Sequence, residues 1–157
     1  MDVHVSRASV TQTRDPHSWN SFDSYVHIHE TRLEQHPFVD PVRTSTIEFT
    51  RGTTYVLMQG EVFCLRDAIV EVSKTFETQQ RNGRLYVRGV LYRYIAWVQG
   101  GNLVLKYHNR HADPNEYHYR AYDPRTGSEI LHEVLERRQF PVFSEVLDEA
   151  DYLTSGL

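Results

Sequence analysis

The chain has 157 residues, of which 39% are hydrophobic, and this is enough for one globular domain with a buried core. The net charge of −4 is not that of a typical nucleic-acid-binding protein, and no apolar run reaches the length of a membrane span, so we expect no membrane association. The single cysteine, Cys64, excludes an internal disulfide framework and fits a reducing compartment, for which the cytoplasm is the default expectation.

The charge is unevenly distributed along the chain. Residues 81–125 hold eight lysines and arginines against three carboxylates, a net charge of +5, so that the remainder carries −9. A basic segment of this kind can bind a polyanion locally without an overall basic protein. The acidic C-terminal segment of the same chain can equally neutralise it, and the sequence leaves both alternatives open.

Residues 1–40 are expected to form a polar, partly ordered N-terminal extension ahead of a single domain over residues 41–157. Within the extension, the residues Tyr25–His29 predict a short strand. His27 and His29 would share one face of that strand, but two imidazoles without further ligands do not predict a metal site. We therefore expect neither a metal nor another cofactor.

Several β segments follow. Thr46–Thr50 and Thr53–Met58, joined by Arg51-Gly52, predict a hairpin, and Gln59-Gly60 predicts a further turn. Residues 65–77 fit both a helical stripe and strand alternation, and their β-branched content favours extended structure.

The most informative stretch is a hairpin whose turn is Gly100-Gly101. If these glycines are the two loop residues, Ile95 lies opposite Lys106 and Arg93 lies opposite His108. Strand alternation then gives one face with Leu91, Arg93, Ile95, Trp97, Val104, Lys106, His108 and Arg110. The other face carries Tyr92, Tyr94, Ala96, Val98, Leu103, Leu105, Tyr107 and Asn109.

The hydrophobic period changes after residues 123–127, which end the sheet region. Apolar residues within 130–135 predict an amphipathic helix capped near Ser128, and those within 143–150 predict a second short helix after Pro141. The outer face of this second helix carries Glu145, Asp148, Glu149 and Asp151. The sequence therefore predicts an α+β fold, an antiparallel β-sheet meander with C-terminal helices packed on one face.

Histidines and cations gather at the end of the predicted hairpin and on the following strand, Tyr117–Tyr122. His108, His111 and His118 are candidate acid–base groups, since imidazoles titrate near neutral pH. The cations that could hold a phosphate are Arg93, Lys106, Arg110 and Arg120. A metal-independent ribonuclease needs these residue types, with tyrosines and Trp97 as surfaces for stacking unpaired bases. The simpler alternative is that the histidines lie on exposed strand ends and in a loop.

The order of these elements resembles the TumE-like family, toxins of prokaryotic toxin–antitoxin pairs. That family has a tyrosine-rich strand, a short glycine-containing turn and an aliphatic run ending in Arg-Tyr-Asp-Asn, followed by a histidine-containing loop and a histidine-rich strand. Here the corresponding segments are Asn102–Asn109, His111 and Glu116–Arg120. The resemblance covers about residues 45–135 and rests on short motifs.

The resemblance implies a growth-inhibiting toxin that acts on RNA and is controlled by an antitoxin protein. Tyr107 and Asn109 match the family motif in type and would orient the substrate. Lys106 stands where the family commonly has arginine, and His108 replaces the usual aspartate.

Two other functions remain open on the residues alone. One is a non-catalytic module that binds nucleic acid or a protein through the basic sheet face. The other is an interaction protein whose basic sheet meets an acidic surface. An antiparallel sheet with an exposed edge can also form a homo-oligomer, although nothing in the sequence requires it.

Overall fold

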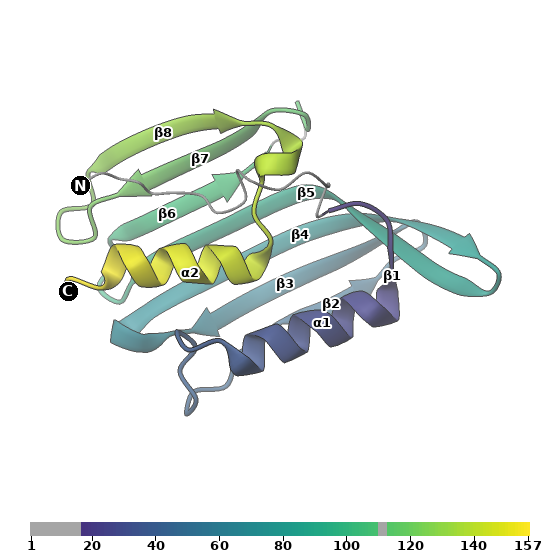
Figure 1. Ribbon diagram of the computed structural model, residues 1–157, viewed down its shortest axis with the longest axis horizontal. Coiled ribbons are helices and arrows are strands. Elements are labelled where there is room, and N and C mark those ends of the chain that lie inside the picture. Colours follow the sequence, from purple (N-terminus) through teal and green to yellow (C-terminus); the bar gives the residue numbers. More distant parts are fainter. Residues whose placement is uncertain (1–16, 110–112) are drawn as a thin grey trace.

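The computed structural model describes residues 17–109 and 113–157. Its main element is an antiparallel sheet in the order β2-β3-β4-β5-β6-β7-β8, with β1 paired to β5 (Figure 1). The strands are β1 (Asn20–Ser21), β2 (Glu48–Arg51), β3 (Tyr55–Phe63), β4 (Ala68–Arg81), β5 (Arg84–Val98), β6 (Leu103–His108), β7 (Tyr117–Tyr122) and β8 (Glu129–Leu135). The helices are α1 (Phe22–Gln35) and α2 (Phe143–Thr154), with short 3₁₀ turns at Leu65–Asp67 and Arg137–Gln139.

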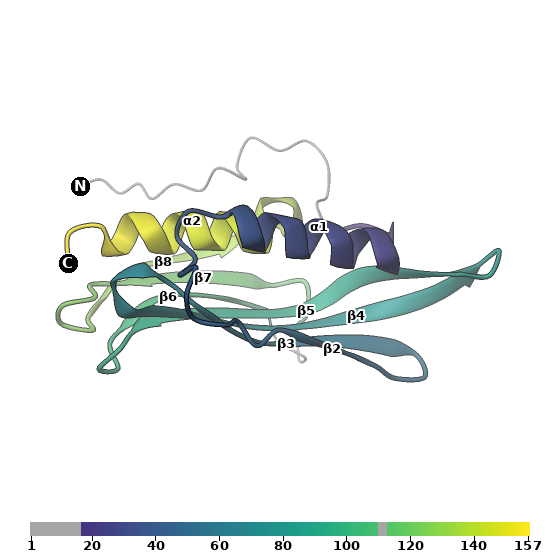
Figure 2. The ribbon, with the colours of Figure 1, turned by 90° about the horizontal axis from the view of Figure 1, so that it is seen from below.

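Both α1 and α2 lie on the same side of the sheet (Figure 2), which we call the inner face. The opposite side is the outer face, and no described helix covers it. The predicted α+β fold, an antiparallel meander with helices on one face, is confirmed. One of the two helices on this face is α2, and the other is α1, which comes from the segment predicted to be an N-terminal extension. Within the described ranges, no helix is long and apolar enough to cross a membrane.

Residues 25–29 belong to α1, so the predicted strand is wrong. Ser21 caps this helix by accepting a hydrogen bond at 3.2 Å from a backbone N–H of the first turn. Phe22, Tyr25 and Leu33 lie along one side of the helix and pack against the hydrophobic core. The strand-like alternation of residues 25–29 is therefore only a short part of a longer apolar pattern with helical spacing.

Residues 130–135 form most of β8, so the helix predicted there is also wrong. Gly127, with φ of +79°, lies in the turn that returns the chain against β7, and Ser128 is part of this turn and caps no helix. Because β8 is an edge strand, Ile130 and Val134 remain 57% and 63% exposed. Apolar residues lie on both faces of this strand, and their spacing in the sequence is the same as that of an amphipathic helix.

The β2–β3 hairpin is confirmed, but β3 continues through the turn predicted at Gln59-Gly60. A Cβ atom at Gly60 would lie 2.1 Å from the carbonyl oxygen of Thr46, so this glycine permits a close backbone approach inside the strand. The extended structure favoured for residues 65–77 is confirmed from Ala68 onward. Strand β4 then continues to Arg81, and Asn82-Gly83 form the turn that joins it to β5.

The β5–β6 hairpin has the predicted register over residues 93–96 and 105–108. A bulge then shifts the pairing, so that Trp97 lies opposite Leu103 instead of Val104. Val104 is fully buried in the hydrophobic core, and Leu103, which was predicted on the opposite face, takes the place across from Trp97.

An aromatic cluster fills the inner side of the central strands. The ring of Phe140, which precedes α2, is fully buried and lies 4.9 Å from Tyr92, 5.6 Å from Tyr107 and 5.0 Å from Tyr117, measured between ring centroids. Because side chains alternate along a strand, these buried tyrosines determine which of their neighbours point to the outer face.

One carboxylate of helix α2 bonds to the sheet, beside the apolar residues of this helix that pack in the core. Glu149 accepts a hydrogen bond at 2.7 Å from the Tyr107 hydroxyl and a second from the Tyr119 hydroxyl. Glu149 was predicted to lie on the outer side of the helix, but its side chain faces the sheet.

Candidate functional site

Alternate residues of β5, β6 and β7 bring cations and imidazoles together on the outer face. The residues beside them, Tyr94, Tyr107 and Tyr119, contact α2 on the inner face. The cross-strand register arranges the outward residues in two neighbouring rows, Arg93–His108–His118 and Lys106–Arg120–His132. We call these six residues the outer-face cluster.

Three side chains of this region form a chain of hydrogen bonds. The Glu116 carboxylate lies 2.6 Å from Nε2 of His118. On the other side of the same ring, Nδ1 of His118 lies 3.0 Å from Nε2 of His132. The ring of His108 is next to them, with its centroid 5.4 Å from that of His118.

Access to these groups differs sharply. His118 is only 5% exposed, because it is covered by its neighbours on β6 and β8. His132, on the edge strand, is exposed, and the Glu116 side chain is 47% exposed. A molecule approaching the outer face therefore meets His132 before His118.

The cations of the cluster are only partly neutralised by this protein. Arg120 forms an ion pair with Glu129 at 2.7 Å. Arg93 is exposed and makes no ion pair with another described residue. One alternative left open by the sequence was that the acidic C-terminal segment neutralises these cations. The acidic helix α2 lies on the inner face, however, and does not cover them.

Tyr107 and Asn109, the residues expected to orient a substrate, point away from the cluster. The Asn109 side chain accepts a hydrogen bond from Tyr92 N at 2.8 Å and donates to the carbonyl oxygens of Val90 and Pro114 at 2.8 and 2.9 Å. Asn109 is 8% exposed and Tyr107 is 1% exposed, so both are held in the structure on the inner side.

The remaining sequence candidates, Arg110 and His111, lie outside the described residues. The structure brings together the other five candidates that share the outer face, namely Arg93, Lys106, His108, His118 and Arg120.

Glu116 and His132 were not among the site residues predicted from the sequence. His132 was assigned to a helix, which hid its position opposite Arg120. Reading residues 129–135 as a strand after the Gly127 turn would have placed this histidine on the same face as Arg120.

An apolar row borders the cluster on the outer face. It runs across four strands through Phe63, Ile69, Trp97 and Leu103. Trp97 lies two positions beyond Ile95 on the face of Arg93, and it is partly exposed. Aromatic and aliphatic surface therefore adjoins positive charge.

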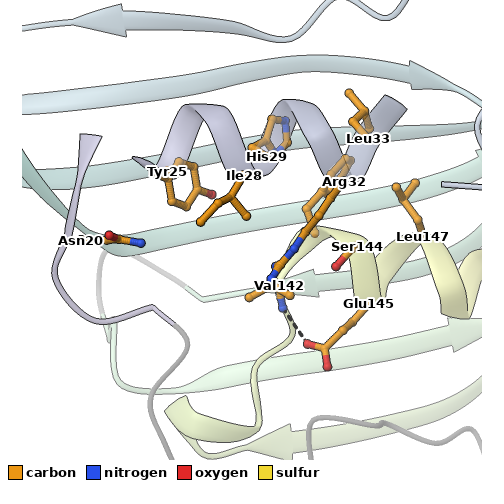
Figure 3. Close-up of a pocket in the computed structure, with 11 residues that line it drawn as sticks. Asn20, Tyr25, Ile28, His29, Arg32, Leu33, Val142, Ser144, Glu145 and Leu147 are labelled. Carbon is orange, nitrogen blue, oxygen red and sulfur yellow. Dashed lines mark hydrogen bonds between the residues drawn. The ribbon is translucent and has the colours of Figure 1, made fainter. Parts of the chain in front are cut away.

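A separate groove of about 470 Å³ lies between α1 and α2 on the inner side (Figure 3). Its walls include Ile28, Leu33 and Leu147, and Arg32 extends from α1 toward the start of α2. Burial, and secondarily the charge of Lys74, lower the pKa of His29 in this groove to about 4, so that its imidazole is neutral at pH 7.

Metal ligation is not supported by the described part of the chain, where no group of three or more histidine, cysteine or acidic side chains could hold an ion. Because residues 25–29 are helical, His27 is exposed while His29 is buried, and the two do not share a face.

Comparisons of the sequence with protein-family models and with curated proteins, and of the structure with solved structures, find no match.

Proposed function

We propose that this protein is a metal-independent ribonuclease that binds and cleaves RNA at the outer-face cluster. The observation that carries the proposal is the convergence of three imidazoles and three cations from four adjacent strands on a face that no described helix covers. Phosphodiester cleavage needs these two kinds of group close together: imidazoles to transfer protons, and cations to stabilise charge on the phosphate oxygens.

The bordering apolar row favours single-stranded RNA as the substrate. An unpaired base can stack on Trp97 while the adjacent phosphate is held by Arg93 or Lys106, two residues of the same face. A paired strand would keep its bases stacked and would offer only its backbone to this surface.

The biological role we propose is that of a toxin inhibited by an antitoxin protein. This part of the proposal rests on the resemblance to TumE-like toxins, and the position of the cluster on a face that no described helix covers supports it, because an antitoxin could inhibit the enzyme by covering that face.

The direct test is RNA cleavage by purified protein. Wild type is incubated with 5′-labelled single-stranded RNA beside His118→Ala, with His27→Ala as the matched control because His27 is exposed on α1, away from the cluster. We expect wild type and the control to cleave the RNA and His118→Ala to be inactive while keeping its circular dichroism spectrum. Full activity of a folded His118→Ala protein would contradict the proposal.

A second candidate function is RNA binding without chemistry, which the low exposure of His118 favours. It predicts that Arg93→Gln and Lys106→Gln each weaken RNA binding. Each should also reduce the slope of the logarithm of the binding constant against the logarithm of salt concentration by about one, while histidine changes have little effect. Arg138→Gln is the control, since its side chain is 63% exposed in the turn before α2. Salt-dependent binding by a wild-type protein that never cleaves RNA would favour this function.

A further inference from the structure

We infer that His132 is the residue that exchanges a proton with the RNA, and that Glu116 and His118 position it through their hydrogen bonds. This inference rests on the proposed ribonuclease function and assigns its catalytic residue. Its basis is the contrast between a covered histidine, a half-exposed carboxylate and an exposed histidine within one hydrogen-bonded chain.

Both ring nitrogens of His118 already have partners. Nε2 faces Glu116 at 2.6 Å and Nδ1 faces His132 at 3.0 Å. A ribose hydroxyl would have to displace one of these neighbours before it could reach the ring. His118 is therefore placed to act through another group.

The partners also determine where the protons lie. An ionised carboxylate only accepts hydrogen bonds, so Nε2 of His118 must donate to Glu116. A neutral His118 then has its lone pair on Nδ1, which accepts a hydrogen bond from Nε2 of His132. The remaining nitrogen of neutral His132, Nδ1, carries the lone pair that can take a proton.

This arrangement is suited to a general base. As O2′ of the ribose bonds to phosphorus, its proton passes to Nδ1 of His132, and the bond from phosphorus to O5′ breaks. The leaving O5′ takes a proton from water, and the resulting hydroxide removes the proton from His132. The products are a 2′,3′-cyclic phosphate and a 5′-hydroxyl end, and the enzyme returns to its starting state.

Glu116 and His118 would assist by dispersing the positive charge. When His132 gains a proton, the hydrogen between His132 and His118 can shift toward His118, next to the carboxylate of Glu116. The same bonds fix the orientation of the exposed ring, which an edge strand alone would leave free to rotate.

The proton positions can be measured without any activity. In ¹⁵N-histidine-labelled protein, long-range ¹H–¹⁵N spectra distinguish a proton on Nε2 from one on Nδ1, and spectra of His118→Gln and His132→Gln assign the signals. We expect both neutral rings to carry the proton on Nε2. A proton on Nδ1 of His118 would overturn the inference.

Cleavage assays separate the catalytic from the positioning histidine. We expect His132→Ala to lose about 100- to 10,000-fold in cleavage rate while still binding labelled RNA. Added imidazole should restore part of this rate, because the missing side chain was exposed. It should not rescue His118→Ala, whose side chain was covered by its neighbours. Rescue of His118→Ala but not of His132→Ala would reverse the assignment.

A third variant tests the carboxylate. Glu116→Gln should lower kcat with little change in KM for RNA. An unchanged kcat would remove Glu116 from the chain of positioning residues. If wild type cleaves no RNA, the ribonuclease proposal fails, whereas the proton positions measured by NMR still test the hydrogen-bonded chain.

Discussion

Glu149 forms hydrogen bonds between helix α2 and the sheet behind the candidate site, and replacing this residue tests what they contribute to stability. In wild type, the Glu149 carboxylate accepts hydrogen bonds from the hydroxyls of Tyr107 and Tyr119, which are 1% and 0% exposed. Glu149→Ala would leave both buried hydroxyls without this acceptor. Each such loss costs about 1–3 kcal/mol, so we expect the free energy of unfolding to fall by about 2–6 kcal/mol.

The assay is urea unfolding followed by circular dichroism and tryptophan fluorescence. Glu149→Gln keeps one acceptor oxygen and should lose less stability than Glu149→Ala. Glu30→Ala, at an exposed position of α1, is the control and should stay within about 0.5 kcal/mol of wild type.

A double-mutant cycle identifies the contact responsible. In a Tyr107→Phe/Tyr119→Phe background the hydroxyls are gone, so Glu149→Ala should cost much less than in wild type. An equal cost in both backgrounds, or a cost below about 0.5 kcal/mol in wild type, would refute the reasoning.

Three further predictions concern single positions. Because burial lowers the pKa of His29 to about 4, only the unfolded chain binds this proton as pH falls from about 6.5 to 4. Stability should therefore drop by roughly 2 kcal/mol between pH 7 and pH 5, and His29→Phe should remove that part of the drop in urea titrations. Gly60→Ala should lower the melting temperature more than Gly83→Ala, because an added Cβ meets the backbone at the first position and open space at the second; equal melting temperatures would contradict this. Burial raises the pKa of the Cys64 thiol to about 12, so a thiol reagent should modify it only after unfolding, and rapid labelling of native protein would be the opposite result.

The sheet was predictable where its signals are local. The glycines of the β5–β6 turn and the residues flanking them determined the pairing of Arg93 with His108, and the structure has this pair. The bulge that places Trp97 opposite Leu103 was not predictable, because no residue in the strand signals it.

The errors came from elements whose faces cannot be read from a short window. Tyr25–His29 alternates like a strand, yet the cap at Ser21 and the longer stripe make it helical. Ile130 and Val134 stay exposed on an edge strand, so their pattern does not mark a buried face. Because residues 130–135 were predicted to be a helix, the position of His132, the exposed end of the hydrogen-bonded chain, was also missed.

Contacts between distant parts of the chain were beyond sequence reasoning. Nothing near Glu149 indicates that its carboxylate meets two tyrosines on different strands. Similarly, the hydrogen bond that Asn109 Oδ1 accepts from Tyr92 N gives this asparagine a structural contact that its motif does not reveal.

The alternation along β6 restricts how this sequence can change length over evolution. Tyr107 is packed behind the sheet while Lys106 and His108 lie in front of it. Without a bulge to absorb it, inserting or deleting one residue between Leu105 and His108 would exchange the two sets, burying charge and exposing the aromatic ring in a single step. We therefore expect substitutions to dominate variation in this part of the strand, whereas the Asn82-Gly83 and Gly100-Gly101 turns are places where the chain can gain or lose residues without moving either set.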